Sequence, residues 1–284
     1  MRIYGKVLKV FPEERILKIE YKNRLFCLYM TRKTFKDFGP YFYKKPYIFA
    51  DIKLELKKYG QYYAYEIVNF IKVIEPSFRE KRIYYDILTI KKDIKKLINK
   101  TKNKLFIDLE FTLPAYYQSI PHVAEIVQYG IIVENNEGEV LFQDSNLVKP
   151  LRKYGLNSRT LSFISRKREE FDNAIEYEEF YNLLESCIKK YKSKIIVWGK
   201  SDILTLEQSF ILNKVKPLDL RKNHINLMQV IKNYYNLKED LGLFNTYQEY
   251  TNSSLEEQTH DALEDAVITR KIYRLFKEKI NSEK

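Results

Sequence analysis

The chain has 284 residues, of which 45% are hydrophobic and 31% are charged, and its formal net charge is +12. This length and apolar content are typical of one or two folded domains and exclude general disorder. Two cysteines are too few for a disulfide framework, and no apolar run approaches the roughly 20 residues of a membrane-spanning helix. We therefore expect a soluble, cytoplasmic protein.

The positive charge is concentrated in the first part of the chain. Residues 1–104 carry a net charge of +15, whereas residues 105–284 carry a net charge of −3. Such an uneven distribution favours a polyanionic partner, and nucleic acid in particular. The alternative interpretation is a lysine-rich composition that serves only solubility.

Residues 1–76 are expected to form a small β-barrel of the OB type. Between the third and fourth expected strands, residues 31–39 predict a short helix, with Thr31 as its N-cap and Gly39 at its end. Three strands, a helix and two strands is the order of an OB-fold, although an SH3-like barrel also has five short strands. The expected strands are rich in β-branched and aromatic residues and lie near 2–11, 15–21, 24–31, 47–57 and 62–74.

The expected barrel contains many tyrosines interleaved with lysines, above all in YFYKK (41–45) and YGQYYAY (59–65). Exposed rings on which bases stack, beside ammonium groups that follow the phosphates, are typical of surfaces that bind single strands. We therefore expect Tyr62, Tyr63 and Tyr65 to contact nucleic acid. Any one of these rings could instead pack in the barrel, and alternation along a strand predicts that at least one does.

Residues 77–103 are interpreted as a basic connector. Isoleucines at 83, 87, 90, 94 and 98, with lysines between them, predict an amphipathic helix over 83–100. A helix that lies on a membrane surface shares this pattern, but no second membrane anchor accompanies it here. We therefore expect a connecting helix and no contact with a membrane.

Residues 104–284 predict an α/β domain around a mixed sheet. LFIDLEF predicts a strand, VQYGIIVE and EVLFQDSNLV predict a hairpin around NNEGE, and KIIVWG predicts a buried strand. Strands followed by alternating helices and a buried strand indicate this fold class. The expected helices lie near 157–165, 175–191, 203–213, 224–235 and 261–279.

Two carboxylates in the first predicted strand of this domain suggest a metal site. Asp108 and Glu110 lie two residues apart in FIDLEFT, so a strand places both on one face. Paired carboxylates repel each other unless a cation lies between them, and hard divalent ions prefer oxygen ligands. Asp202 follows the apolar strand IIVWG where a helix begins, a position at which an N-cap role is the alternative.

A histidine and a carboxylate near the C-terminus complete the set of candidates. In THDALEDA, His260 fits the junction of a loop and a helix, and Asp265 fits a position one turn further on. A histidine can accept a proton from water near neutral pH, while a carboxylate holds a metal. The neighbouring Asp261 and Glu264 are expected to be surface residues of the same helix.

Together, these segments resemble the motifs of the DEDDh 3′–5′ exonuclease superfamily. Asp108 and Glu110 fit its first motif, Asp202 its second, and His260 with Asp265 its third. PHVAEIVQYGIIV, with Glu125 and Gly130, is similar to the second strand of the family. The DLEFT and WGKSD forms are most similar to the branch with the sporulation-inhibitor and histone-mRNA exonucleases. Leu113 and Pro114 stand where proofreading subunits usually have glycine, which argues against polymerase proofreading.

The resemblance implies a ribonuclease-H-like exonuclease domain with a mixed five-stranded sheet over residues 104–284. It also implies release of nucleoside monophosphates from the 3′ end of single-stranded RNA or DNA, with RNA slightly favoured. Two Mg²⁺ or Mn²⁺ ions would be held by Asp108, Glu110 and Asp265, with Asp202 supporting the second ion through water. His260 would be the general base.

Two further roles follow from the resemblance, and one alternative remains. Phe111 and Thr112 would lie near the terminal sugar and base. His122 and His224 have no carboxylate partner at motif spacing and are expected to be structural. The alternative function is that of a catalytically silent protein that binds nucleic acid or docks a partner on an exonuclease-like fold.

Overall fold

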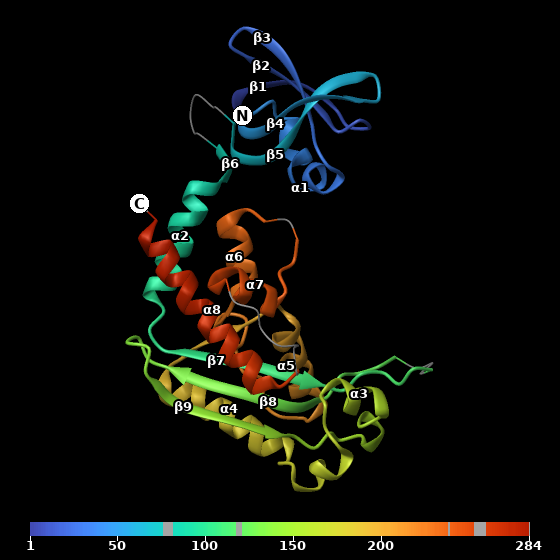
Figure 1. Cartoon of the computed structure of the whole chain (residues 1–284), viewed down its shortest axis with the longest axis vertical. Coiled ribbons are helices and arrows are strands. Elements are labelled where there is room, and N and C mark those ends of the chain that lie inside the picture. The colour runs from blue at the N-terminus through green and yellow to red at the C-terminus, as the bar shows by residue number, and fades with distance from the viewer. Residues whose placement is uncertain (76–81, 118–120, 238, 253–259, 284) are drawn as a thin grey trace. The chain divides into compact units, whose positions relative to one another are not determined.

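The chain divides into two units, Met1–Asp93 and Ile94–Lys284, in a computed structural model that describes residues 1–75, 82–117, 121–237, 239–252 and 260–283 (Figure 1). Residues 77–81, with which the predicted basic connector begins, lie outside the described residues. Within the described ranges, no helix combines the length and the apolar character that crossing a membrane requires.

The first unit contains a closed barrel of five strands. Its sheet has the order β3-β2-β1-β4-β5-β6, and β3 also pairs with β5 in parallel, with Leu28 opposite Tyr65. This second pairing closes the barrel in the strand order of an OB-fold, so the predicted OB-like barrel is confirmed. The elements are β1 (Arg2–Phe11), β2 (Ile16–Tyr21), β3 (Arg24–Tyr29), α1 (Arg32–Phe42), β4 (Tyr47–Tyr59), β5 (Tyr62–Glu75) and β6 (Arg82–Asp86).

Helix α1 continues past its predicted end. Thr31 is the N-cap, as predicted, but the helix runs through Gly39 and Pro40 to Phe42. Phe42 is fully buried and packs on Phe70, with 5.4 Å between the ring centroids. Because burial of such a ring contributes about 1.5–3 kcal/mol, the barrel core stabilises the last turn and the local stop signal at Gly39 is overridden.

The predicted helix over 83–100 begins later than expected. Arg82–Asp86 form β6, which pairs antiparallel with β5, and α2 (Ile87–Lys100) follows directly. The carboxylate of Asp86 accepts a hydrogen bond from the backbone N–H of Leu88 at 3.1 Å, as helix-capping residues do. Ile83 therefore lies on a strand, and the division between the two units falls within α2.

The second unit is built on a mixed sheet of five strands, as predicted. The strand order is β11-β10-β7-β8-β9, with β7 at the centre. Strand β7 pairs antiparallel with β8 and parallel with β10. The strands are β7 (Lys104–Phe111), β8 (Ile126–Glu134), β9 (Val140–Leu147), β10 (Lys194–Val197) and β11 (His224–Asn226).

Two of the helical segments differ from the sequence-based expectation. Residues His224–Asn226 form strand β11, so that α6 begins only at Leu227, with Asn226 as its N-cap. Helix α7 has no counterpart among the predicted helices. The helices are α3 (Ser158–Phe163), α4 (Tyr177–Tyr191), α5 (Ser201–Leu212), α6 (Leu227–Tyr235), α7 (Leu243–Thr251) and α8 (Ala262–Ser282), with 3₁₀ turns at Lys153–Gly155 and Arg168–Asn173.

Strand β7 is covered on both faces, and this decides where its polar residues lie. Leu105, Ile107 and Leu109 share a hydrophobic core with side chains of α4 and α5. On the other face, Phe106 contacts Tyr273 of α8, with 5.6 Å between the ring centroids. Figure 1 shows α8 crossing one face of the sheet and α4 lying across the other. Residues 108 and 110 follow Phe106 at a spacing of two and therefore share the face that α8 covers.

Candidate active site

Strand β7 presents Asp108 and Glu110 on the same face of the sheet. Asp108 lies opposite Gly130 of β8, and Glu110 lies opposite Gln128. Glu110 is buried and Asp108 is half-buried. The predicted pair of carboxylates thus stands at the centre of the sheet, where water solvates it poorly.

Asp202 lies in the first turn of α5, directly after β10. Its side chain is buried, and Oδ1 accepts a hydrogen bond from the backbone N–H of Leu109 at 3.2 Å. The N-cap of α5 is Lys200, so the alternative role of Asp202 as the helix cap is wrong. The carboxylate instead turns toward the strand that carries Asp108 and Glu110.

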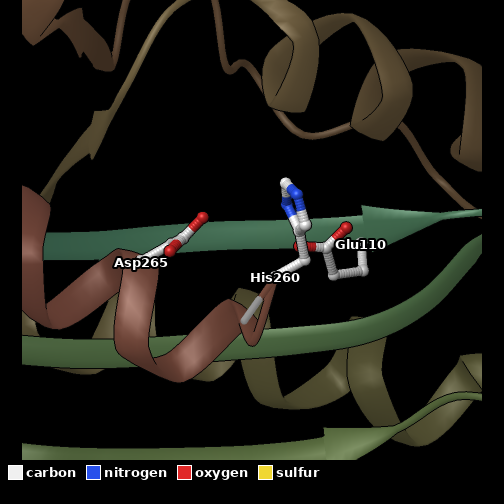
Figure 2. Close-up of side chains that lie close together, drawn as sticks. All are labelled: Glu110, His260 and Asp265. Atoms are coloured by element: carbon white, nitrogen blue, oxygen red, sulfur yellow. The ribbon is translucent and has the colours of Figure 1, made fainter. Parts of the chain in front are cut away.

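The N-terminal end of α8 brings a histidine and a further carboxylate to the same place. Asp265 is buried in the first turn of α8, and His260 lies two residues before the helix, at the predicted junction. Glu110, His260 and Asp265 each offer a ligand atom, and these three atoms lie within 4.8 Å of one another. Figure 2 shows Glu110 on β7, with His260 and Asp265 coming from the start of α8.

Burial and like charge raise the pKa values in this cluster. Desolvation, followed by the charges of Asp202, Asp265 and Glu110, holds the pKa of Asp108 well above its usual range. Desolvation and then Asp265 and Asp202 raise the pKa of Glu110 to about 8. Desolvation raises the pKa of Asp202 to about 7, although hydrogen bonds from backbone N–H groups partly offset it.

This electrostatic arrangement fits a divalent cation. The neighbouring charges that raise the pKa values of Asp108 and Glu110 are all carboxylates. Carboxylate oxygens are the ligands that hard divalent ions prefer, and a cation among them would relieve their repulsion. The site is therefore a candidate metal centre.

Asp261 is not the surface residue that its sequence position predicts. It is the N-cap of α8 and is half-buried. Burial opposes its charged form, but hydrogen bonds from Gln128 and from the first turn of α8, together with Arg166, lower the pKa of Asp261. An aspartate directly before an apolar helical pattern is an N-cap signal that could have revealed this role. Glu264 is exposed, as predicted.

Thr112 and Phe111 continue from β7 into the surrounding structure. Thr112 is buried, and its hydroxyl accepts a hydrogen bond from the backbone N–H of Glu125 at 3.0 Å and contacts Nε2 of His122 at 3.2 Å. Phe111 is half-buried and packs against the hydrophobic core. His224 contacts the backbone oxygen of Leu220 through Nδ1 at 2.9 Å.

The three tyrosines expected to bind nucleic acid lie on β5 of the first unit and differ in exposure. Tyr63 is 63% exposed. Tyr62 is half-buried against Phe11, with 4.7 Å between the ring centroids, and Tyr65 packs against the barrel core. The expectation that at least one of the three packs in the barrel is confirmed, and Tyr63 offers the largest free ring surface.

Carboxylates from three distant segments converge beside a histidine, on the central strand of a mixed sheet and at the start of the helix that covers it. This combination of fold and site defines the class of the DEDDh exonucleases. Comparison with known proteins agrees with this class. The sequence model of the exonuclease family matches residues 105–273, and the chain belongs to this family.

Individual relatives support the same conclusion. Over 179 residues the chain is 29% identical to the probable 3′-5′ exonuclease KapD of Bacillus subtilis (strain 168), covering 63% of this chain and 86% of KapD. The fold matches the nuclease domain of 3′hExo, a DEDDh family member, bound to rAMP, with a TM-score of 0.54 and 17% identity over 63% of this chain and 94% of that one.

Two more solved structures share this fold. One is a 3′-exonuclease in a structure that describes 3′-end specific recognition of a histone mRNA stem-loop. It matches with a TM-score of 0.55 and 16% identity, over 63% of this chain and 65% of that one. Cell-death related nuclease 4 matches with a TM-score of 0.53 and 18% identity, over 64% and 65%. The predicted DEDDh 3′–5′ exonuclease is confirmed.

Proposed function

We propose that this exonuclease removes nucleoside monophosphates from the 3′ end of single-stranded nucleic acid by two-metal-ion hydrolysis, with RNA favoured over DNA. The observation that carries the proposal is the convergence of Glu110, His260 and Asp265 within 4.8 Å, beside the half-buried Asp108 and the buried Asp202. Two Mg²⁺ or Mn²⁺ ions bound there would lower the pKa of water and stabilise charge on the leaving 3′ oxygen.

The five residues have three roles in this proposal. Asp108, Glu110 and Asp265 would hold the ions directly, and Asp202 would support the second ion through water. His260 accepts the proton of the attacking water. The closeness of its imidazole to the carboxylates of Glu110 and Asp265, outside the helix, supports this role.

The nucleotide at the 3′ end would be positioned by residues at the end of β7. Phe111 and the segment that begins at Thr112 adjoin the carboxylate cluster along the chain. The hydroxyl of Thr112 is engaged inside the protein with Glu125 and His122, so it would support the shape of this segment and would not bond to the sugar itself.

The substrate class rests on charge, on aromatic surface and on relatives. The net charge of +15 over residues 1–104 favours a polyanion, and exposed Tyr63, with Tyr62 and Tyr65 beside it, supports base stacking on the OB-like barrel. We place RNA before DNA because one structure with this fold has rAMP bound and another concerns recognition of a histone mRNA stem-loop.

The deciding experiment uses RNA and DNA strands of one sequence, labelled at either end, with Mg²⁺, with Mn²⁺ or with chelator. We expect a label at the 3′ end to appear at once as mononucleotide, and a label at the 5′ end to give a ladder of shortening strands. A 3′-phosphate should slow the reaction, and Asp108→Ala should abolish it. Internal fragments would contradict the proposed direction, and cleavage in chelator would contradict the metal mechanism.

A further inference from the structure

Asp261 links the segment that carries His260 to two other parts of the second unit. Its Oδ1 accepts hydrogen bonds from the backbone N–H groups of Leu263 at 3.1 Å and Glu264 at 3.2 Å. Its Oδ2 accepts hydrogen bonds from Nε2 of Gln128 at 2.9 Å and from Nη2 of Arg166 at 2.9 Å. Two donors on each oxygen determine the orientation of this carboxylate. Hydrogen bonds to a charged group are stronger than those between neutral groups.

The backbone of Arg166, whose side chain contacts Asp261, is fixed by a turn. It follows α3 in a turn in which its backbone N–H donates to the carbonyl of Leu161 at 3.0 Å. Its guanidinium lies 3.4 Å from Glu170, farther than from Asp261, and this exposed ion pair contributes little to the position of Arg166. The side chain of Arg166 is 34% exposed and that of Asp261 is 31% exposed, so water screens this ion pair only in part.

The end of α3 also contacts His260 directly. The ring of Phe163, the last residue of α3, stacks on the imidazole with 4.1 Å between the centroids and 27° between the planes. Residues 163–166 therefore make two contacts with the His260 segment. Phe163 stacks on the imidazole, and Arg166 donates a hydrogen bond to the adjacent Asp261.

His260 needs such support because its own backbone is in an unfavourable region. Its φ angle is +50°, in the left-handed region that residues with a side chain seldom adopt. It also lies outside α8, two residues before the first helical residue. Among the described residues, Phe163 contacts the imidazole from outside this segment, and Arg166 contacts the adjacent Asp261.

We infer that Arg166 and Phe163 are positioning residues for His260. Arg166 holds the His260–Asp261 segment through Asp261, and Phe163 sets the plane of the imidazole over the carboxylate cluster. The inference rests on the proposed role of His260 as general base. The competing role for Arg166 is a direct contact with a phosphate of the substrate strand. Loss of a positioning residue lowers kcat, whereas loss of a phosphate contact raises KM.

The kinetic test compares Arg166→Ala and Arg166→Lys with the control Glu170→Ala, on a short single strand with Mn²⁺. A misplaced base slows the chemical step, so Arg166→Ala should lower kcat by about 10- to 100-fold with little change in KM. Arg166→Lys should recover part of this loss, because an ammonium group can still donate to Asp261. Glu170→Ala should retain kcat. A raised KM with unchanged kcat would identify a phosphate contact and overturn the inference.

A second measurement reads the position of the imidazole without substrate. The chain has three histidines, His122, His224 and His260, so NMR signals from labelled imidazoles can be assigned by comparison with His260→Ala. The stacked ring of Phe163 should shift the His260 signals upfield. Arg166→Ala and Phe163→Leu should each reduce that shift, whereas Glu170→Ala should not.

The two measurements separate failure of the inference from failure of the proposed function. If His260→Ala keeps full turnover, the role of His260 as general base is wrong, whatever the NMR signals show. If Arg166→Ala leaves the His260 signals unmoved, the positioning role is wrong even if His260 is essential. Should Arg166→Ala fail to fold, Phe163→Leu carries the kinetic test, and unchanged kcat in it would overturn the inference.

Discussion

A Cβ atom on Gly130 would lie 2.3 Å from the carbonyl oxygen of Ala262. Gly130 lies opposite Asp108 in the pairing of β8 with β7, and Ala262 is the first residue of α8. The missing side chain therefore lets the start of α8 lie against the sheet beside the catalytic strand. This close approach brings Asp265 next to the carboxylates of β7.

We expect Gly130→Ala to lower both stability and activity. The added methyl group must displace the backbone of Ala262, and such overpacking typically costs about 1–3 kcal/mol. Urea unfolding and turnover on a single strand measure the two effects. The control is Gly39→Ala in α1, where the new Cβ would lie no closer than 3.4 Å to the Phe35 ring. That change should leave stability unchanged or raise it slightly, and equal losses in both variants would refute the packing argument.

Without metal, the contribution of the buried carboxyls to the free energy of unfolding should fall as pH rises from roughly 4 to 8. Glu110, with a pKa of about 8, and Asp202, with a pKa of about 7, hold their protons more tightly in the folded state than in the unfolded one. The stability that these protons contribute is complete at low pH and is lost as pH rises through the folded-state values.

Unfolding curves in chelator and in Mg²⁺ test this linkage. Bound ions should replace the protons, so Mg²⁺ should stabilise the protein most at high pH and flatten the pH dependence. Glu110→Gln removes one of the titrating groups and should reduce the slope in chelator. A stability that rises with pH in chelator would contradict the assignment.

His260→Ala should lower turnover by about 10²- to 10⁴-fold, the usual contribution of a general base. Binding of the strand should change little, because the carboxylates and the barrel are untouched. His224→Ala is the matched control. The one described hydrogen bond of the His224 side chain joins Nδ1 to the backbone oxygen of Leu220. Equal turnover in the two variants would show that His260 accepts no proton in the reaction.

Tyr63→Ala should weaken the binding of long single strands by about 5- to 150-fold, because stacking on one ring contributes about 1–3 kcal/mol. The salt dependence should not change, since the ring carries no charge. Lys58 lies opposite Tyr63 in the β4–β5 pairing, and Lys58→Gln should make the salt slope shallower by about 0.7 if it contacts one phosphate.

Leu54→Ala controls for exposed apolar surface on the same barrel, because Leu54 is 74% exposed but cannot stack a base as a ring does. Its affinity for long strands should match that of the unmodified protein. Cleavage of very short oligonucleotides should be unchanged in all three variants. If Tyr63→Ala binds long strands normally, the surface around Tyr63 is not the one that holds the substrate.

Features that depend on neighbours a few positions apart could be predicted from the sequence. Alternation along a strand placed Asp108 and Glu110 on one face, and the turn signals of NNEGE placed the hairpin of β8 and β9. The order of the barrel elements predicted its class, and the spacing of the motifs indicated the exonuclease family. These patterns can be predicted from the sequence because their causes, backbone geometry and helix capping, act within a few residues.

Only the tertiary structure decided the features that join distant parts of the chain. Burial of Phe42 in the barrel extends α1 past Gly39, and pairing with β5 turns residues 82–86 into a strand. Asp261 meets Gln128, which lies 133 positions away, and Arg166, which lies 95 positions away. No local pattern encodes such contacts, because they arise only when the sheet and α8 pack together and bury the same polar groups.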